Sequence, residues 1–242
     1  MAVRGGRALN WAWHLRRLAA DCERLKLACP QESLLRQEVA RVAEGDATVK
    51  LLVTRGAGGR GYAIPENAAA SRTVAAFPPA NYDPALARDG VRIRRCALVL
   101  SEQPRLAGAK TLNRLENVLA RSEWSDAAIS EGLVADAAGR VIEATMSNLF
   151  VVRYGVVTTP DLSRCGVVGA QRERVRELLA GAGFECRVAD LSWSEVESAD
   201  ELFLTNSLIG AWPVTRMEER AWRVGPVTRR VQSLIEAQDA NA

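Results

Sequence analysis

The second half of the chain alternates short β-patterned stretches with glycine-containing turns, and this alternation restricts the fold class. Residues 131–135 and 141–144 flank Ala138-Gly139, and each side carries the apolar residues of a strand. This pattern is typical of a β-hairpin. The other elements predicted in this half are a second hairpin (148–153 with 156–159, around Tyr154-Gly155), helices at 169–180 and 227–237, and strands at 184–188 and 202–206. Together they predict an α+β fold.

The first half predicts a smaller α+β unit. Apolar residues recur at three- and four-residue steps in its two helices, whereas its strands are runs rich in valine and leucine. The predicted elements are helices at 10–27 and 32–43 and strands at 48–54, 72–77 and 91–100, with a connection at 81–90.

A break in regular structure near residues 104–113 predicts the boundary between two domains. Pro104 and Gly108 interrupt the pattern there. The expected division is a smaller N-terminal domain at 1–104, a linker at 105–112 and a larger C-terminal domain at 113–242. The helix predicted at 112–122 should turn its apolar side inward, with the residues Leu112, Leu115, Val118 and Leu119.

The composition excludes several classes of function. A net charge of +3 with well-mixed acids and bases does not indicate a nucleic-acid surface, and no run of eighteen apolar residues predicts a membrane span. The N-terminus lacks the apolar core of a secretory signal, so we expect a cytoplasmic protein. A single histidine, His14, and scattered cysteines argue against a metal site and against Ser-His or Cys-His catalysis.

Lys110 is a candidate catalytic residue because lysine is rare in this chain. Lysine and arginine together number 32, yet Lys26, Lys50 and Lys110 are the only lysines. A lysine amine can lose its proton and form an imine with a carbonyl, whereas a guanidinium stays charged. A solvated surface lysine is the alternative interpretation.

Three features of the second half suit an imine-forming lysine. Glu143 ends a strand, where a buried acid can face a ring nitrogen. Gly169, Ala170 and Gln171 begin a helix whose free N–H groups can cradle a phosphate, and Thr205-Asn206-Ser207 ends a strand with hydroxyls that can complete the cradle. A lysine, a ring-nitrogen acid and a phosphate cup are the groups that pyridoxal 5'-phosphate needs.

A glycine-rich stretch, Arg55-Gly56-Ala57-Gly58-Gly59-Arg60-Gly61-Tyr62, contains the literal pattern G-x-G-x-x-G after a strand. A dinucleotide-binding turn needs a helix to start at its last glycine, and the residues that follow have no helical period. The stretch is better interpreted as a glycine loop that presents Arg55, Arg60 and Tyr62 to a ligand.

The runs 107–120, 143–150 and 200–207 together resemble the class IV (fold type IV) pyridoxal-phosphate enzymes. This group includes branched-chain and D-amino-acid aminotransferases and aminodeoxychorismate lyase. The resemblance extends over nearly the whole chain, and the glycine loop together with Lys110-Thr111-Leu112-Asn113-Arg114-Leu115-Glu116 is most similar to the lyases. It implies a two-domain fold like that of D-amino-acid aminotransferase, and a homodimer with the site near the subunit contact.

The resemblance also implies roles for individual residues. Lys110 would hold the cofactor, Glu143 would pair with the pyridine nitrogen, and Arg17 would bind the phosphate. The phosphate cup would be completed by Gly169, Ala170, Gln171 and Ser207. The residues expected to meet the substrate are Arg55, Arg60, Tyr62, Arg114 and Asn206.

The implied reaction is elimination of pyruvate from aminodeoxychorismate to give 4-aminobenzoate for folate synthesis. Two alternatives stay open: an amino-acid transaminase of the branched-chain or D-amino-acid type, and a shortened, inactive homologue that keeps the fold. The family normally begins with a strand hairpin that this chain lacks, so we expect the N-terminal domain to be truncated.

Overall fold

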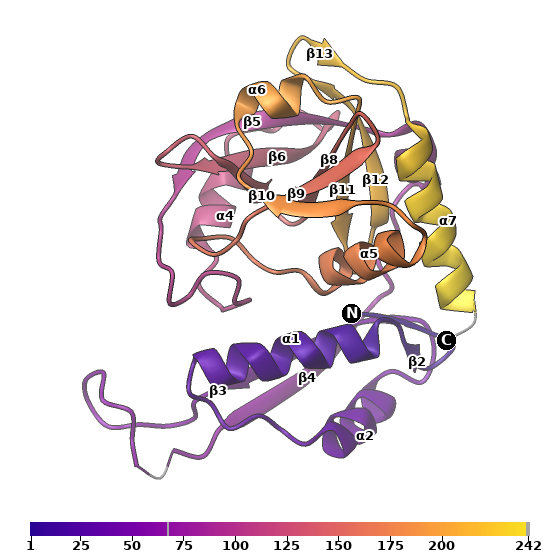
Figure 1. Ribbon diagram of the computed structural model, residues 1–242. Coiled ribbons are helices and arrows are strands. Elements are labelled where there is room, and N and C mark those ends of the chain that lie inside the picture. Colours follow the sequence, from indigo (N-terminus) through magenta and orange to yellow (C-terminus); the bar gives the residue numbers. More distant parts are fainter. Residues whose placement is uncertain (67, 241–242) are drawn as a thin grey trace. The chain divides into compact units, whose positions relative to one another are not determined.

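The computed structural model describes residues 1–66 and 68–240, which form two compact units (Figure 1). The first unit comprises residues 1–81 and the second residues 82–242. Within the described ranges, no helix has both the length and the apolar character needed to cross a membrane.

The first unit is a four-stranded antiparallel sheet with two helices. The strand order is β2-β1-β3-β4, from β1 (Ala2–Arg4), β2 (Arg7–Ala8), β3 (Ala47–Thr54) and β4 (Ser71–Phe77). The helices α1 (Trp11–Arg24) and α2 (Glu32–Val42) supply apolar side chains to one core with this sheet. Val3, Trp11, Leu35 and Val49 are buried in that core, as the amphipathic periodicity of both helices requires.

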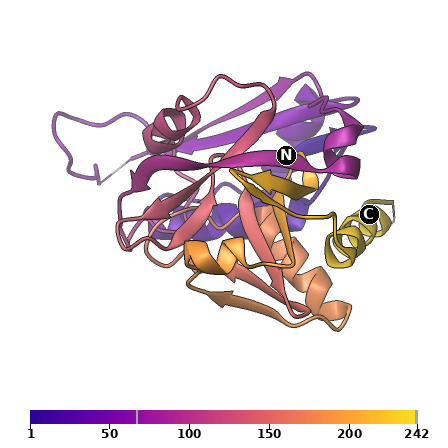
Figure 2. The same cartoon turned by 90° about the horizontal axis from the view of Figure 1, so that it is seen from above.

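The second unit contains a nine-stranded mixed sheet that curls on itself (Figure 2). The strand order is β10-β9-β8-β11-β12-β5-β6-β7, and β13 pairs with β12. The strands are β5 (Val91–Leu100), β6 (Ile129–Asp136), β7 (Val141–Ala144), β8 (Asn148–Arg153), β9 (Val156–Pro160), β10 (Cys186–Ala189), β11 (Glu201–Asn206), β12 (Gly210–Met217) and β13 (Arg220–Ala221). The central strands are buried on both faces and are correspondingly apolar.

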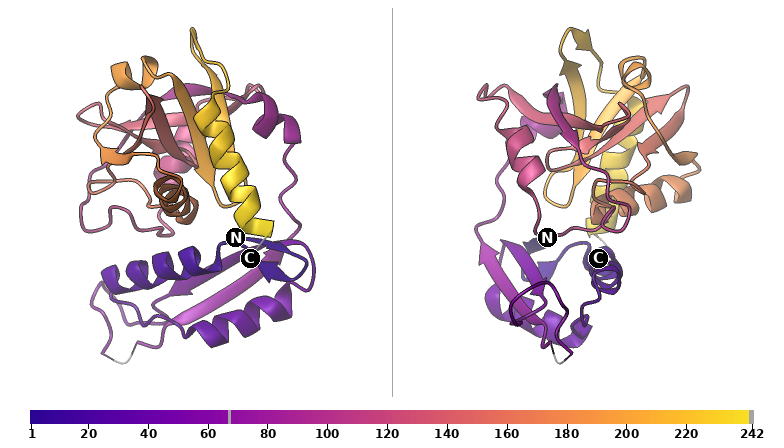
Figure 3. Two further views of the ribbon diagram at one scale, coloured as in Figure 1. Left: turned by 45° about the vertical axis from the view of Figure 1, so that its right-hand side comes forward. Right: turned by 90° about the vertical axis from the view of Figure 1, so that its left-hand side faces the viewer.

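Helices cover both faces of the second sheet. On one face α5 (Ala170–Gly181) and α7 (Pro226–Ala240) share a core with stacked Phe150 and Phe203, and Figure 3 shows α7 alongside β12. On the other face the core contains Leu149, Leu204 and Trp212. The remaining helices are α3 (Pro84–Asp89), α4 (Leu115–Arg121) and α6 (Trp193–Glu197).

Both predicted hairpins are confirmed, and so is the rejection of a dinucleotide-binding turn. β6 pairs antiparallel with β7, and β8 with β9, where Tyr154 and Gly155 both have positive φ as a tight primed turn needs. The glycine loop joins β3 to β4, which pair antiparallel from Thr54 and Ser71, and the described residues between the loop and β4 contain no helix. The predicted α+β fold is therefore confirmed.

The predicted domain boundary is wrong. The units divide between Asn81 and Tyr82 rather than near residue 104. The reason is that β5 hydrogen-bonds to β6 and β12 in the second sheet, so residues 91–100 belong with the C-terminal part. The irregular residues at 104–113 are a loop inside the second unit. The predicted connection at 81–90 also contains a helix, α3, which Asp83 caps through the Ala85 N–H.

The inward side predicted for the helix at 112–122 is also wrong. Helix α4 is shorter, and it uses buried Ala120 to pack against Leu100 and Val134. The apolar side chains predicted to face inward are instead exposed: Leu112, Leu115, Val118 and Leu119. The periodicity correctly predicted one apolar face, but that face does not lie against this unit's core.

Candidate active site

The loop that carries Lys110 is held by a backbone pairing with the segment before α5. Gly108 N–H donates to the Gly166 carbonyl at 2.9 Å, and Val168 N–H donates to the Gly108 carbonyl at 2.9 Å. Gly108 has a φ of 80°, which explains the glycine at this position. Ala107 and Ala109 are buried, whereas Lys110 is exposed. The lysine thus projects from a fixed backbone.

Glu143 is a buried carboxylate on β7, attached to the same segment. Its Oε2 accepts from Val167 N–H at 2.9 Å, and Asn148 Nδ2 lies 3.5 Å from that oxygen. Burial raises the pKa of Glu143 to about 7, opposed by the Val167 N–H and by the charges of Arg114 and Lys110. Val167 pairs with Gly108 and also binds Glu143, so one residue joins the lysine loop to the acid.

The N-terminus of α5 is fixed beside this acid by Asn148. The side chain of Asn148 donates to the Val167 carbonyl at 2.8 Å and accepts from Gly169 N–H at 3.2 Å. A Cβ on Gly169 would lie 2.2 Å from Asn148 Oδ1, so the close approach requires glycine. Ala170 and Gln171 then start a twelve-residue helix, whose N-terminal amides and dipole favour an anion.

The end of β11 lies against the same region. Thr205 is the direct cross-strand partner of Asn148. Its hydroxyl is buried and has no hydrogen-bond partner in the part of the chain that the structure describes. A buried hydroxyl is usually satisfied, so this one is available to a bound group. Ser207 is partly exposed in the turn that follows.

Asn206 is predicted to contact the substrate, but its side chain is hydrogen-bonded to other residues of the protein. Its Nδ2 donates to the Met146 carbonyl at 3.2 Å and to Ser147 Oγ at 3.3 Å. Its Oδ1 accepts from Leu208 and Ile209 N–H groups. These four bonds shape the turn at the end of β11.

Arg114, at the start of α4, lies in the electrostatic environment of Glu143. Its guanidinium donates to Thr111 Oγ1 at 3.1 Å and to Asn117 Oδ1 at 3.5 Å. Its Nε is buried and has no hydrogen-bond partner among the described residues. The second unit therefore brings together most of the predicted site residues: Lys110, Arg114, Glu143, Gly169, Ala170, Gln171, Asn206 and Ser207.

The other predicted residues belong to the first unit, so their contribution to this site stays a prediction. Arg17 lies on α1, where burial lowers its pKa and the charge of Asp21 only partly offsets this effect. Arg55 donates to the carbonyls of Leu25 at 2.5 Å and Lys26 at 2.8 Å, just beyond the end of α1. Arg60 and Tyr62 are exposed in the glycine loop.

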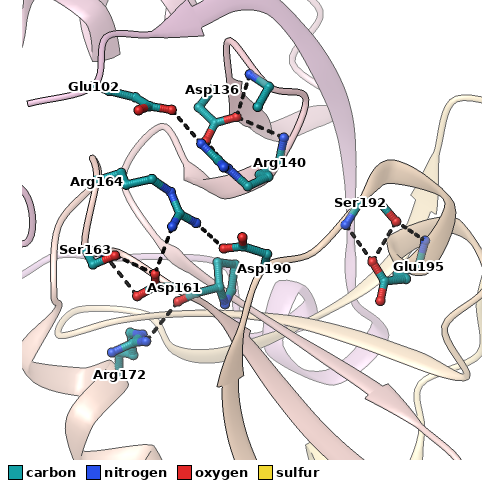
Figure 4. A network of polar contacts seen from close by, with 12 residues as sticks. Glu102, Asp136, Arg140, Asp161, Ser163, Arg164, Arg172, Asp190, Ser192 and Glu195 are labelled. Atoms are coloured by element: carbon teal, nitrogen blue, oxygen red, sulfur yellow. Dashed lines mark hydrogen bonds and ion pairs between the residues drawn. The ribbon is translucent and has the colours of Figure 1, made fainter. Parts of the chain in front are cut away.

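Ion pairs connect several loops of the second unit (Figure 4). Arg140 binds Asp136 at 2.6 Å and Glu102 at 2.5 Å, and Arg164 binds Asp190. The Arg164 carbonyl accepts from Gln103 N–H at 2.9 Å, which joins the approach to Lys110 to the segment leading to α5. Such bracing holds a site in one geometry before a ligand arrives.

Three polar residues that organise the site were not predicted from the sequence: Asn117, Glu131 and Asn148. Asn117 donates to the Thr145 carbonyl at 3.0 Å, and buried Glu131 accepts from Ser147 Oγ at 2.7 Å. Asn148 and Glu131 each open an otherwise apolar strand stretch, which was the available signal.

Comparisons with known proteins show the family to which the chain belongs. The family model for amino-transferase class IV matches residues 1–217. Aminodeoxychorismate lyase from Vibrio harveyi is 34% identical, over 94% of this chain and 86% of that protein. The crystal structure of 4-amino-4-deoxychorismate lyase from Pseudomonas aeruginosa is 44% identical with a TM-score of 0.93, covering 98% of this chain and 88% of that one. A T.th. branched-chain amino acid aminotransferase, solved with pyridoxamine 5'-phosphate, is 25% identical with a TM-score of 0.79, covering 94% and 78%.

Proposed function

Because the chain belongs to the amino-transferase class IV family, we propose that it is an aminodeoxychorismate lyase dependent on pyridoxal 5'-phosphate. It would convert 4-amino-4-deoxychorismate into pyruvate and 4-aminobenzoate, a precursor for folate synthesis. The observation that carries the proposal is the double role of Val167, which pairs with Gly108 of the lysine loop and donates to Glu143. The similarity to two lyases, one at 44% identity, favours elimination over amino-group transfer.

The residues in the second unit fit the cofactor. The buried hydroxyl of Thr205 on β11 lies opposite Asn148 and has no hydrogen-bond partner among the described residues, so it suits a phosphate oxygen. Glu143 suits a protonated ring nitrogen, because a cation there would compensate the cost of its burial. Lys110 would attach the cofactor covalently, and the amides of Ala170 and Gln171 with the Ser207 hydroxyl would hold its phosphate. Arg17 would also bind the phosphate.

When bound, pyridoxal 5'-phosphate supplies an electron sink for a carbanion. The protein's part is to move one proton and to fix the substrate. Lys110 Nζ, freed when the substrate amine takes its place on the cofactor, would take the proton from the carbon that bears this amine, acting as general base. Glu143 would keep the ring nitrogen protonated by staying ionised beside it. Loss of the enolpyruvyl group as pyruvate leaves an aromatic ring, which makes elimination strongly downhill.

Of the arginines predicted to meet the two substrate carboxylates, Arg114 is the best supported. It acts on Glu143 electrostatically, and its buried Nε has no hydrogen-bond partner in the described chain. Arg55 already donates to two backbone carbonyls. Arg60, Tyr62 and Asn206 remain candidates for the rest of the substrate.

The test is to load the purified protein with cofactor and add aminodeoxychorismate. We expect pyruvate and 4-aminobenzoate in equal amounts, measured by a lactate-dehydrogenase coupled assay and by fluorescence. Cofactor-loaded protein that releases no pyruvate would contradict the proposal. Amino-group transfer to 2-oxoglutarate from branched-chain or D-amino acids would instead identify a transaminase, and failure to bind the cofactor would identify an inactive homologue.

The active form is proposed to be a cytoplasmic homodimer. The exposed apolar residues before and on α4, including Leu115 and Val118, support a protein contact on that side of the second unit. Light scattering on a sizing column should give twice the chain mass of 26.3 kDa, and Leu115→Glu should reduce it to one chain mass. A wild-type protein that elutes as a monomer would refute this part of the proposal.

A further inference from the structure

A second buried carboxylate, Glu131 on β6, lies next to the proposed site and has no role in the reaction described above. Its side chain is fully buried. Oε1 accepts from Met146 N–H at 3.2 Å and from Ser147 Oγ at 2.7 Å, and Oε2 contacts Thr145 Oγ1. One carboxylate therefore binds three successive residues of the turn between β7 and β8.

This turn lies between two residues of the proposed site. Glu143 comes two residues before Thr145, and Asn148 directly follows Ser147. Glu143 holds the Val167 N–H, and Asn148 holds Gly169 at the start of α5. Any shift of the turn would displace both contacts together.

The turn is also the meeting point of two other elements. Asn117 of α4 donates to the Thr145 carbonyl at 3.0 Å. Asn206 at the end of β11 donates to Met146 and Ser147. Glu131 is the one carboxylate within this set of contacts, and it binds all three turn residues. Burial raises the pKa of Glu131, and the hydroxyl and amide donors of the turn lower it.

We propose that Glu131 is a positioning residue for the reaction at Lys110. By fixing the turn at 145–147, it keeps Glu143 at the cofactor ring and Asn148 at the helix N-terminus that receives the phosphate. The inference rests on the proposed function for its link to the cofactor.

Two substitutions of Glu131 distinguish the effect of its hydrogen bonds from the effect of its charge. In Glu131→Gln, the amide oxygen can accept from Met146 and Ser147, and the amide nitrogen can donate to Thr145. Glu131→Ala leaves all three turn donors without this acceptor. We expect Glu131→Gln to bind pyridoxal 5'-phosphate within about threefold of wild type, and Glu131→Ala to bind it about tenfold or more weakly.

Glu201 provides a matched control. It is also a buried glutamate with three donors, but these are Val227 N–H, Thr228 N–H and Thr228 Oγ1 at the start of α7. Glu201→Ala should lower the melting temperature about as much as Glu131→Ala does, without changing the cofactor dissociation constant or the visible circular dichroism of bound cofactor.

Hydrogen exchange of the cofactor-free protein gives a readout independent of catalysis. Glu131→Ala should speed amide exchange at residues 143–150 and 165–171, whereas Glu201→Ala should speed it at 225–232. The proposal is overturned if Glu131→Ala loses only melting temperature, as Glu201→Ala does, or if Glu131→Gln is as impaired as Glu131→Ala. A wild type that binds cofactor but makes no pyruvate would refute the lyase and leave these comparisons valid.

Discussion

The tip of the glycine loop, at Gly59 and Gly61, and the segment at 166–169 both contain glycines, but the surroundings of these glycines differ. A Cβ on Gly59 or Gly61 would meet no atom within 4 Å, whereas one on Gly166 would lie 2.7 Å from Ile142 and one on Gly169 would lie 2.2 Å from Asn148. Open glycines leave a loop adaptable, whereas crowded glycines bring backbone against a fixed partner. A glycine pattern therefore indicates a preformed site only when neighbouring side chains close on it.

Near the segment at 166–169, the largest loss of activity is expected from substitution of Lys110. Lys110→Ala should abolish the visible absorbance of lysine-bound cofactor and lower turnover about a thousandfold or more, because the base and the covalent attachment are both removed. Spectrophotometry and the pyruvate assay measure the two effects. Lys50→Ala, an exposed lysine on β3, is the control and should change neither. An unchanged absorbance band in Lys110→Ala would contradict the assignment.

Gly169→Ala tests the crowded segment directly. The new Cβ would collide with Asn148 Oδ1, so we expect a loss of about 2 kcal/mol in free energy of unfolding and a cofactor dissociation constant about tenfold higher. Urea unfolding and fluorescence titration are the measurements. The matched substitution Gly59→Ala, at the open tip of the glycine loop, should leave the free energy of unfolding within about 0.5 kcal/mol of wild type. Equal effects at the two glycines would show that crowding at Gly169 does not matter for stability or cofactor binding.

Glu143→Gln should change the pH dependence of stability in the cofactor-free protein. Burial raises the pKa of Glu143 to about 7 from an ordinary value of 4.5. The folded state then holds this proton more tightly than the unfolded state, so the stabilising contribution is complete below pH 4.5 and is lost as the pH rises toward 7. Removing the carboxyl should reduce this fall in unfolding free energy with rising pH, which amounts to about 3 kcal/mol at most. Urea unfolding at pH 5, 6 and 7 measures it.

Asp136 gives a control of opposite sign for that experiment. Its burial, which raises the pKa, is outweighed by its bonds with Arg140 and Ala138, so the pKa of Asp136 is lowered. Its contribution is present above its ordinary pKa and is lost as the pH falls. Asp136→Asn should therefore lose most stability near neutral pH. Identical slopes in the Glu143 and Asp136 variants would show that neither titration governs stability.

The smallest effect is expected at Arg55, at the first residue of the glycine loop. Arg55→Ala removes two bonds to the carbonyls of Leu25 and Lys26, which should cost about 1 kcal/mol of unfolding free energy with little change in KM. If Arg55 instead binds a substrate carboxylate, KM should rise at least about tenfold while the melting temperature stays constant. Thermal melts and steady-state kinetics on one preparation distinguish these outcomes.

Sequence patterns predicted most helices and strands because local periodicity dictates which residues are buried along one element. They failed where the structure depends on contacts with residues distant in the sequence. The leucines of 112–122 form one apolar face, but no local pattern shows that Ala120 would be the residue packed inward. The boundary near residue 104 was misplaced for the same reason, since the pairing of β5 with β6 and β12 joins distant segments.

The candidate site divides similarly. Lys110, Glu143 and Gly169 were predictable from residue chemistry and from the family resemblance. Asn148 and Glu131 were not, because their partners at Gly169 and at the 145–147 turn are defined by hydrogen bonds that close only in the folded chain.

The link from Gly108 through Val167 to Glu143 consists largely of main-chain atoms. Its bonds use the amides and carbonyls of residues 108 and 166–168. Gly108 and Gly166 have a positive φ that favours glycine, whereas at Val167 and Val168 every residue type except proline can supply the same groups. An alanine substitution at Val167 would therefore report only the loss of its buried side chain, although its N–H lies at the junction of the site. The side chains at positions 167 and 168 can change while these bonds persist, and Val167→Pro is the substitution that would remove the N–H bond to Glu143.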